Sequence, residues 1–282
     1  MTHIAFLGTG LLGGALAEAA AKRGDSIVAW NRTTEKARAL EKFGVRVATT
    51  PADAVRGATR VHLVLKDDAV VESVIAAFRP GLEPETIVVD HTTTQPALTA
   101  ARAERLSGEG VKYLHCPVFI GPAAARAGSG TILAAGPRAL FDAVKPALSR
   151  MAARVEYFGE RPDLAAVFKL CGNALIIGIN AVVSDVLSVA SGAAADPAEA
   201  LRVVEVFDVG AIVNGRGRNM LRRDYAPSFE LEMARKDVRL MIETAGETPL
   251  AALPAVANRM DALIAQGRGA DDLAVIGRDA VG

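Results

Sequence analysis

The sequence is poor in cysteine and has no excess of charge of either sign. Its 282 residues include two cysteines, Cys116 and Cys171. Their number and spacing indicate neither a disulfide framework nor a metal site, and a reducing, cytoplasmic setting fits them. Lys plus Arg and Asp plus Glu both number 32. This balance gives no general attraction to nucleic acid or to an anionic membrane.

The sequence also lacks an uncharged run that could cross a membrane. Residues 4–17 carry no charge, but they have no basic start, and Gly8 and Gly10 divide them into strand, turn and helix. The run around residues 174–183 contains Asn180, follows Asn173 and is too short between charges to span a bilayer. We therefore expect a soluble protein with no membrane partner.

Short apolar strands alternate with helical patterns through the first half of the chain, which predicts an α/β fold with a doubly wound parallel sheet. The expected strands are residues 4–7, 26–30, 45–47, 61–65, 87–90, 111–116 and 130–135. The expected helices between them are residues 11–23, 34–43, 52–55, 69–78 and 95–107.

The second half of the chain shows no convincing strand and predicts an all-α domain. A helix over residues 163–190 is apolar on several faces, so we expect it to be buried deeply or between subunits. Further helices are expected after Asp196, after Ser228 and after Pro254. The expected domains are residues 1–161 and 162–282.

Three glycines follow the first strand in the pattern Gly8-x-Gly10-x-x-Gly13. Because the pattern follows a strand and opens a helix, it is typical of a dinucleotide-binding turn whose backbone approaches a pyrophosphate. A glycine-rich turn with only a structural role is the alternative.

The second strand ends in Asn31-Arg32-Thr33, where many dinucleotide-binding folds have an acidic residue. A carboxylate there would hold a ribose hydroxyl and repel a 2′-phosphate. Asn31 is neutral, and Arg32 can pair with phosphate oxygens. The site is therefore expected to bind NADP(H), unless Arg32 is only a solvated surface charge.

Lys169 and Asn173 are four residues apart, so they share one face of an otherwise apolar helix. Burying an amine and an amide without partners is costly, and a lysine can act as a general acid. A lysine that extends from a packed helix to water is the alternative.

Taken together, four segments resemble the β-hydroxyacid dehydrogenase family, which includes 3-hydroxyisobutyrate dehydrogenase and 6-phosphogluconate dehydrogenase. They occur in the family's order and cover nearly the whole chain. The segments are the glycine turn with Asn31-Arg32-Thr33, residues 89–93 (VDHTT), Lys169 with Asn173, and residues 236–240 (KDVRL).

The resemblance implies a Rossmann domain followed by a helical domain, with the active site between them and a homodimer or tetramer formed through the helical domain. It implies that Lys169 is the catalytic lysine and Asn173 its substrate-orienting partner. It also implies that Leu11, Leu12, Leu65, Lys66, Thr93 and Lys236 bind the cofactor, and that Asp237 braces the substrate site.

One motif departs from the family. A Ser-Gly-Gly turn that usually holds the substrate carboxylate is here Phe119-Ile120-Gly121. The hydroxyl is lost and two bulky apolar side chains replace it. The substrate is therefore expected to be a carbonyl compound with an apolar or aromatic body instead of a small acid.

The sequence as a whole predicts an NADPH-dependent oxidoreductase in which Lys169 exchanges a proton with the substrate oxygen. Two alternatives remain open: an imine reductase-like enzyme, and a non-catalytic NADP-binding interaction module. Related imine-reducing members usually lack the lysine, which favours carbonyl chemistry here.

Overall fold

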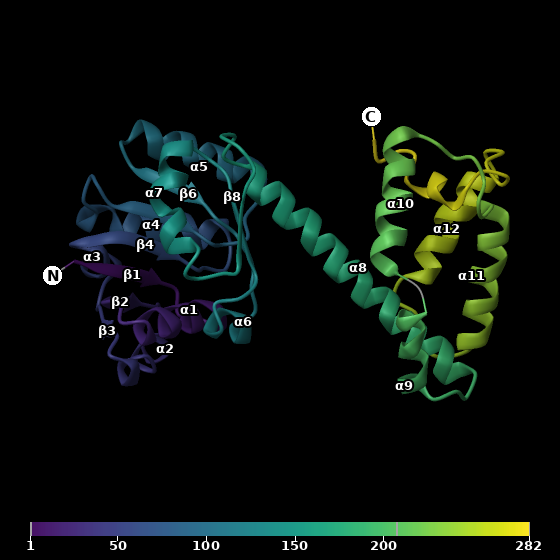
Figure 1. The fold of residues 1–282 in the computed structure, drawn as a ribbon, viewed down its shortest axis with the longest axis horizontal. Helices are drawn as coiled ribbons and strands as arrows, with labels where there is room; N and C mark the ends of the chain where they lie inside the picture. The colour runs from purple at the N-terminus through teal and green to yellow at the C-terminus, as the bar shows by residue number, and fades with distance from the viewer. Residues whose placement is uncertain (1, 207, 282) are drawn as a thin grey trace. The chain divides into compact units, whose positions relative to one another are not determined.

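The computed structural model describes residues 2–206 and 208–281 and divides the chain into two compact units, Met1–Asn173 and Ala174–Gly282. The first unit is built on a six-stranded sheet (Figure 1). The strands of this sheet are β1 (His3–Leu7), β2 (Ile27–Trp30), β3 (Arg46–Val47), β4 (Ala58–Leu63), β5 (Ile87–Asp90) and β6 (Lys112–His115).

The strands of this sheet are all parallel and lie in the order β3-β2-β1-β4-β5-β6. The order reverses between β1 and β4, which is where a doubly wound sheet opens a crevice at the carboxyl ends of its strands. The sheet confirms the predicted α/β fold class.

Helices cover both faces of the sheet and bury its apolar side chains in two separate cores. They are α1 (Leu11–Lys22), α2 (Thr34–Arg38), α3 (Pro51–Val55), α4 (Asp68–Phe78), α5 (Pro96–Gly108), α6 (Pro122–Arg126) and α7 (Arg138–Leu148). Helix α1 packs closely because alanines fill its buried face, among them Ala15, Ala17 and Ala20.

A second, three-stranded sheet follows β6 in the first unit. It consists of β7 (Val118–Phe119), β8 (Thr131–Ala134) and β9 (Arg154–Tyr157), with β7 antiparallel and β9 parallel to β8. The sequence patterns indicated β8 but neither β7 nor β9. Phe119 packs beside Phe158 and Leu164 against a small core of Leu133 and Ala165.

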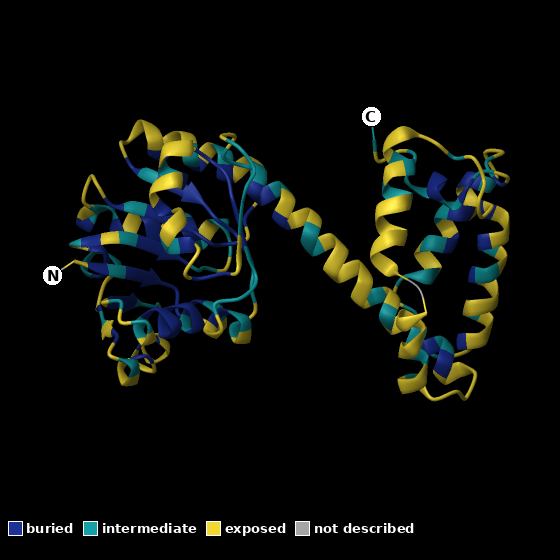
Figure 2. Ribbon diagram, viewed as in Figure 1, coloured by how far each residue is buried: buried dark blue, intermediate teal, exposed yellow. Residues whose placement is uncertain are grey.

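Helix α8 (Leu164–Gly192) begins in the first unit and continues into the second. It is long and apolar enough to cross a membrane by length and composition, but only 17% of its most apolar window is buried within the chain. Figure 2 shows exposed residues along much of its length. The helix is therefore not buried deeply within the chain, as one of the two expectations had it. The other expectation, burial between subunits, stays a prediction.

Helices are the regular elements in the described part of the second unit, which also has an isolated bridge between Glu230 and Asp272, and this confirms the predicted all-α region. Its helices after α8 are α9 (Pro197–Ala200), α10 (Val209–Arg222), α11 (Leu231–Ala245) and α12 (Leu253–Ile264). Leu231, Val238, Met260 and Leu263 form its buried core. The domain boundary at residue 161 stays a prediction.

Candidate active site

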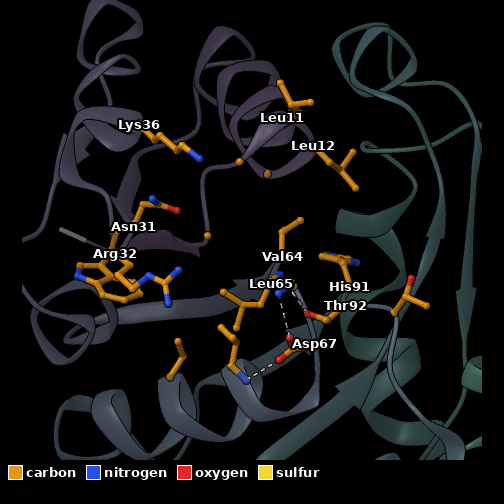
Figure 3. Close-up of a pocket in the computed structure, with 18 of the residues that line it drawn as sticks. Leu11, Leu12, Asn31, Arg32, Lys36, Val64, Leu65, Asp67, His91 and Thr92 are labelled. Carbon is orange, nitrogen blue, oxygen red and sulfur yellow. Dashed lines mark hydrogen bonds and ion pairs between the residues drawn. The ribbon is translucent and has the colours of Figure 1, made fainter.

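A cavity of about 820 Å³ opens at the carboxyl ends of β1, β2, β4 and β5, and all of its lining residues belong to the first unit. Figure 3 shows side chains from these strand ends and from α1, α2 and α4 around it. The cavity therefore lies at the switch point of the sheet, where such folds bind their ligands.

The glycine turn forms one wall of this cavity. Each of its three positions requires or favours glycine for a different structural reason. Gly8 has a φ of +95°, and a Cβ there would lie 2.2 Å from the Val64 carbonyl oxygen. A Cβ on Gly13 would lie 2.0 Å from the Gly8 carbonyl oxygen. A Cβ on Gly10 would meet nothing within 4 Å, so the backbone at the start of α1 is left accessible to a phosphate group.

The side chain of Asn31 joins the end of β2 to the glycine turn. Its Oδ1 accepts a hydrogen bond from the Thr9 backbone N–H at 2.9 Å, and its Nδ2 donates to the Thr33 carbonyl oxygen at 2.9 Å. A carboxylate could make the first of these bonds but not the second. Asn31 therefore fixes the shape of the site, in addition to removing a negative charge from it.

Positive charge dominates the lining of the cavity. Arg32, Lys36, Lys66 and Lys169 line it, whereas Asp67 is the carboxylate among its described lining residues. In Figure 3, Arg32 and Lys36 lie on either side of Asn31 at the same end of the cavity. Two cations beside the end of β2 suit a ligand that carries phosphate groups there.

Lys169, on the first turns of α8, contributes an amine to the same cavity. The residue is 8% exposed, and burial lowers the pKa of its amine because the charged form loses hydration. Its Nζ donates to Asn173 Oδ1 at 2.9 Å and lies 4.0 Å from the centre of the Phe119 ring. Lys169 therefore contributes a partly dehydrated amine to the lining of the cavity.

Beneath the cavity, a chain of hydrogen bonds ties together the ends of β4, β5 and β6. Arg60 Nε donates to His62 Nε2 at 2.8 Å, His62 Nδ1 bonds His91 Nε2 at 2.8 Å, and His91 Nδ1 bonds the Cys116 carbonyl oxygen at 2.7 Å. Because Arg60 can only donate, each imidazole of this chain is neutral and protonated on Nδ1. Burial lowers the pKa of His91 to about 4.

This protonation pattern gives His91, which lines the cavity, a structural role in place of a catalytic one. Thr92 beside it accepts a hydrogen bond from the Leu65 backbone N–H at 3.1 Å, which holds the loop after β4 against the end of β5. Burial also lowers the pKa of His115.

Most of the residues singled out from the sequence line this one cavity: Gly8, Gly10, Leu11, Leu12, Gly13, Asn31, Arg32, Thr33, Leu65, Lys66, Thr93, Ile120 and Lys169. Asn173 and Phe119 do not line the cavity, but both contact the Lys169 amine, Asn173 through a hydrogen bond and Phe119 through its ring face. Gly121 is the N-cap of α6 and does not line the cavity. Lys236 and Asp237 lie on α11 of the second unit, where they form an ion pair at 3.0 Å.

Lining residues that the sequence reasoning missed include Trp30, Lys36, Val64 and Asp67. Lys36 could have been predicted as a lining residue, because it stands four residues after Arg32 at the start of an expected helix. Val64 and Asp67 flank the expected loop after the fourth strand.

The cavity fits a dinucleotide. Gly10 leaves room at the start of a helix, cations lie beside the end of β2, and Thr92 and Thr93 lie at the end of β5. Backbone N–H groups and cations would hold the phosphates of such a ligand.

Comparison with known protein families accounts for nearly the whole chain. Residues 3–159 match the model described as the NAD binding domain of 6-phosphogluconate dehydrogenase. Residues 164–278 match the model described as NAD-binding of NADP-dependent 3-hydroxyisobutyrate dehydrogenase.

Individual proteins show the same likeness. The chain is 29% identical over 265 residues to glyoxylate/succinic semialdehyde reductase 1 of Arabidopsis thaliana, covering 89% of each chain. It is also 29% identical over 265 residues to an uncharacterized oxidoreductase of Shewanella frigidimarina, covering 90% of each. The imine reductase of Myxococcus stipitatus, solved with NADP+, shares the fold with a TM-score of 0.86 at 20% identity, over 98% of this chain and 99% of that one.

Proposed function

The chain belongs to the β-hydroxyacid dehydrogenase family and is an NAD(P)-dependent oxidoreductase, and we propose that it uses NADPH to reduce a carbonyl group, with Lys169 as the proton donor. The observation that carries this proposal is the buried amine of Lys169 in the wall of the cavity that begins at the glycine turn.

The preference for NADPH rests on the end of β2. Arg32 and Lys36 line the cavity there, and Asn31 replaces the carboxylate that would repel a 2′-phosphate. The glycine turn and the first N–H groups of α1 would hold the pyrophosphate, and Leu65, Lys66 and Thr93 would line the path toward the nicotinamide. The bound cofactor supplies the hydride.

Lys169 would supply the proton that the substrate oxygen gains on reduction, and would remove it in the reverse direction. Its amine is bonded to Asn173 and to no other hydrogen-bond or ion-pair partner among the described residues. N–H groups therefore remain for a substrate oxygen. Because burial lowers its pKa, the amine can release its proton more readily than an exposed lysine.

The substrate side of the cavity is apolar. Val118 and Ile120 line it, and the segment that carries them passes Lys169 at Phe119. Apolar walls favour an aldehyde or ketone with an apolar body, because they gain free energy from covering apolar ligand surface. The Arabidopsis relative is named for glyoxylate and succinic semialdehyde, so small acids are the natural comparison.

Three roles proposed for the remaining residues rest on the family. Asn173 would orient the substrate oxygen together with Lys169. Lys236 would contact the nicotinamide side of the cofactor, and Asp237 would brace the substrate.

Turnover of NADPH and NADH with a panel of substrates tests the proposal. The panel contains uncharged aldehydes and ketones, succinic semialdehyde and a cyclic imine. Oxidation of NADPH by a carbonyl compound, faster than that of NADH, supports the proposal. Turnover of the imine alone would favour the imine reductase alternative, and tight NADPH binding with no turnover of any compound would favour a non-catalytic module.

A further inference from the structure

Phe119 occupies the place where the family has a small serine, yet it does not line the cavity. Its ring lies beside the Lys169 amine, and Lys169 Nζ is 4.0 Å from the ring centre. An ammonium over the face of an aromatic ring at this distance is attracted by the negative face of the π system. The residue that departs from the family therefore contacts the amine proposed as the proton donor.

Helix α8 is shaped to receive this ring. A Cβ on Gly172 would lie 2.2 Å from Phe119 Cζ and 2.9 Å from Cε1. Glycine in the interior of a helix is unfavourable relative to alanine, so its presence here needs a reason. The ring of Phe119 provides that reason, because it fills the space beside the helix one turn from Lys169.

The packing of the ring in a small apolar core also fixes its position. Phe119 packs in the small core that contains Phe158 and Leu164, and Phe158 lies 4.5 Å from Phe168, ring centre to ring centre. The same Lys169 amine also donates a hydrogen bond to Asn173 Oδ1 at 2.9 Å. The ring and the amide together restrict the ammonium to one place beside the cavity.

We propose that Phe119 is a positioning residue for the reaction: its ring face holds the Lys169 ammonium in place and in its protonated form, and Gly172 makes room for that ring. This inference rests on the proposed function, because it gives Lys169 the role of the proton donor. Burial disfavours the charged amine, and the ring face opposes that effect without adding a competing acidic group.

Titration of the Lys169 amine tests the inference without a substrate. The protein is labelled with ¹³C-lysine, the Lys169 signal is assigned by its loss in Lys169→Arg, and its pKa is followed by NMR. Phe119→Leu keeps an apolar side chain beside the Lys169 amine but removes the aromatic ring. It should lower the pKa of Lys169 by roughly 0.4 to 1.5 units, the range that corresponds to a cation–π contact.

Phe158→Leu is the matched control, because it removes a ring from the same small core without touching Lys169. It should shift the pKa of Lys169 less than Phe119→Leu does, because the Phe119 ring stays beside the amine. A shift in Phe119→Leu no larger than that in Phe158→Leu would overturn the inference. In the enzyme, the fall in the kcat of carbonyl reduction at high pH should move to lower pH in Phe119→Leu by the same amount as the NMR titration.

Gly172→Ala gives an independent test that keeps Phe119 in the chain, and an unchanged pKa of Lys169 in this variant would overturn the inference by itself. The added methyl group must displace the ring, so this variant should lower the pKa of Lys169 in the same direction. In a Phe119→Leu background the same change should have little further effect, because the ring is already gone. Equal effects of Gly172→Ala in both backgrounds would contradict the inference.

The two proposals can fail separately. If the pKa of Lys169 is unshifted in Phe119→Leu and the Lys169→Met variant is inactive, the role of Phe119 is wrong and Lys169 is still supported as the proton donor. A fully active Lys169→Met variant would overturn the proposed function, whatever the titration shows.

Discussion

Arg32 and Lys36 bring two positive charges to the end of β2, and Arg32 should contribute to NADPH affinity specifically. Arg32→Ala should weaken NADPH binding by about 1–3 kcal/mol, the scale of a charge-assisted hydrogen bond, and leave NADH binding nearly unchanged. Calorimetric titration with both cofactors measures this. Arg38→Ala, an exposed change on α2 that does not line the cavity, is the control. Equal losses for NADPH and NADH in Arg32→Ala would contradict the assignment.

Ile120 should set part of the substrate preference, because it lines the cavity where the family has glycine. The wild type should have a higher kcat/KM for butanal than for succinic semialdehyde. Ile120→Gly should narrow that ratio about fivefold, since a partly buried side chain contributes roughly 1 kcal/mol of apolar contact. A wild type that prefers the acid, or a ratio that Ile120→Gly leaves unchanged, would show that this turn does not select the substrate.

At the scale of single residues, local patterns identified those whose position follows from the strand-turn-helix unit. Gly8, Gly13, Asn31 and Arg32 belong to this group. The contact between Phe119 and Lys169 was not predictable in this way. It joins a two-residue strand to a helix 50 positions later, and no periodic pattern encodes which side chains meet across that separation.

Among the structural elements, the chain from Arg60 through His62 and His91 to Cys116 should make stability depend on pH. An unfolded histidine binds a proton near pH 6.5, whereas burial holds the pKa of folded His91 at about 4. Its contribution is therefore complete above pH 6.5 and is lost as the pH falls toward 4, by roughly 3 kcal/mol in total.

His91→Gln should remove the contribution of His91 to this pH dependence, while buried His62 and His115 keep theirs. The variant should be less stable than the wild type at pH 7.5, but it should lose less stability on acidification. Urea unfolding of both proteins from pH 7.5 to pH 4.5 provides the comparison. Parallel stability curves across this range would mean that His91 is not held neutral by the fold.

The sequence patterns missed α6, α7 and α10 among the helices and β7 and β9 among the strands, and two of these elements have identifiable physical features. Helix α10 contains Gly210, Gly215 and Gly217, which lower its helix propensity, although Asp208 caps its start by accepting from the Ala211 N–H. Strand β7 has two residues, too few for an alternating pattern. The main strands were predictable because each is an apolar run bounded by turn residues, with ends misplaced by up to three residues.

At the scale of the whole molecule, the exposed apolar side chains of α8 predict that the protein binds a second copy of itself through this helix. Leu175, Ile176, Ile177 and Val182 are each at least half exposed in the single chain. Several large apolar side chains exposed on one helix are typical of an interaction site, and the family resemblance implies a homodimer or tetramer. Light scattering at micromolar concentration should give at least twice the chain mass of 29.4 kDa.

Ile177→Glu should shift the protein toward the monomer, because it places a charge on that apolar surface. Leu98→Glu, at an exposed position on α5 of the first unit, is the control and should leave the assembly intact. A wild type that remains a 29.4 kDa monomer would contradict the assembly.

The role of Lys169 is the central claim. Lys169→Met tests it most directly, because methionine keeps an unbranched apolar stem and removes the terminal amine. NADPH affinity should stay within about twofold of the wild type, while the kcat of carbonyl reduction should fall by roughly 10²–10⁴, the usual contribution of a general acid. A Lys169→Met variant that reduces the same carbonyl compound at the wild-type rate would contradict the account.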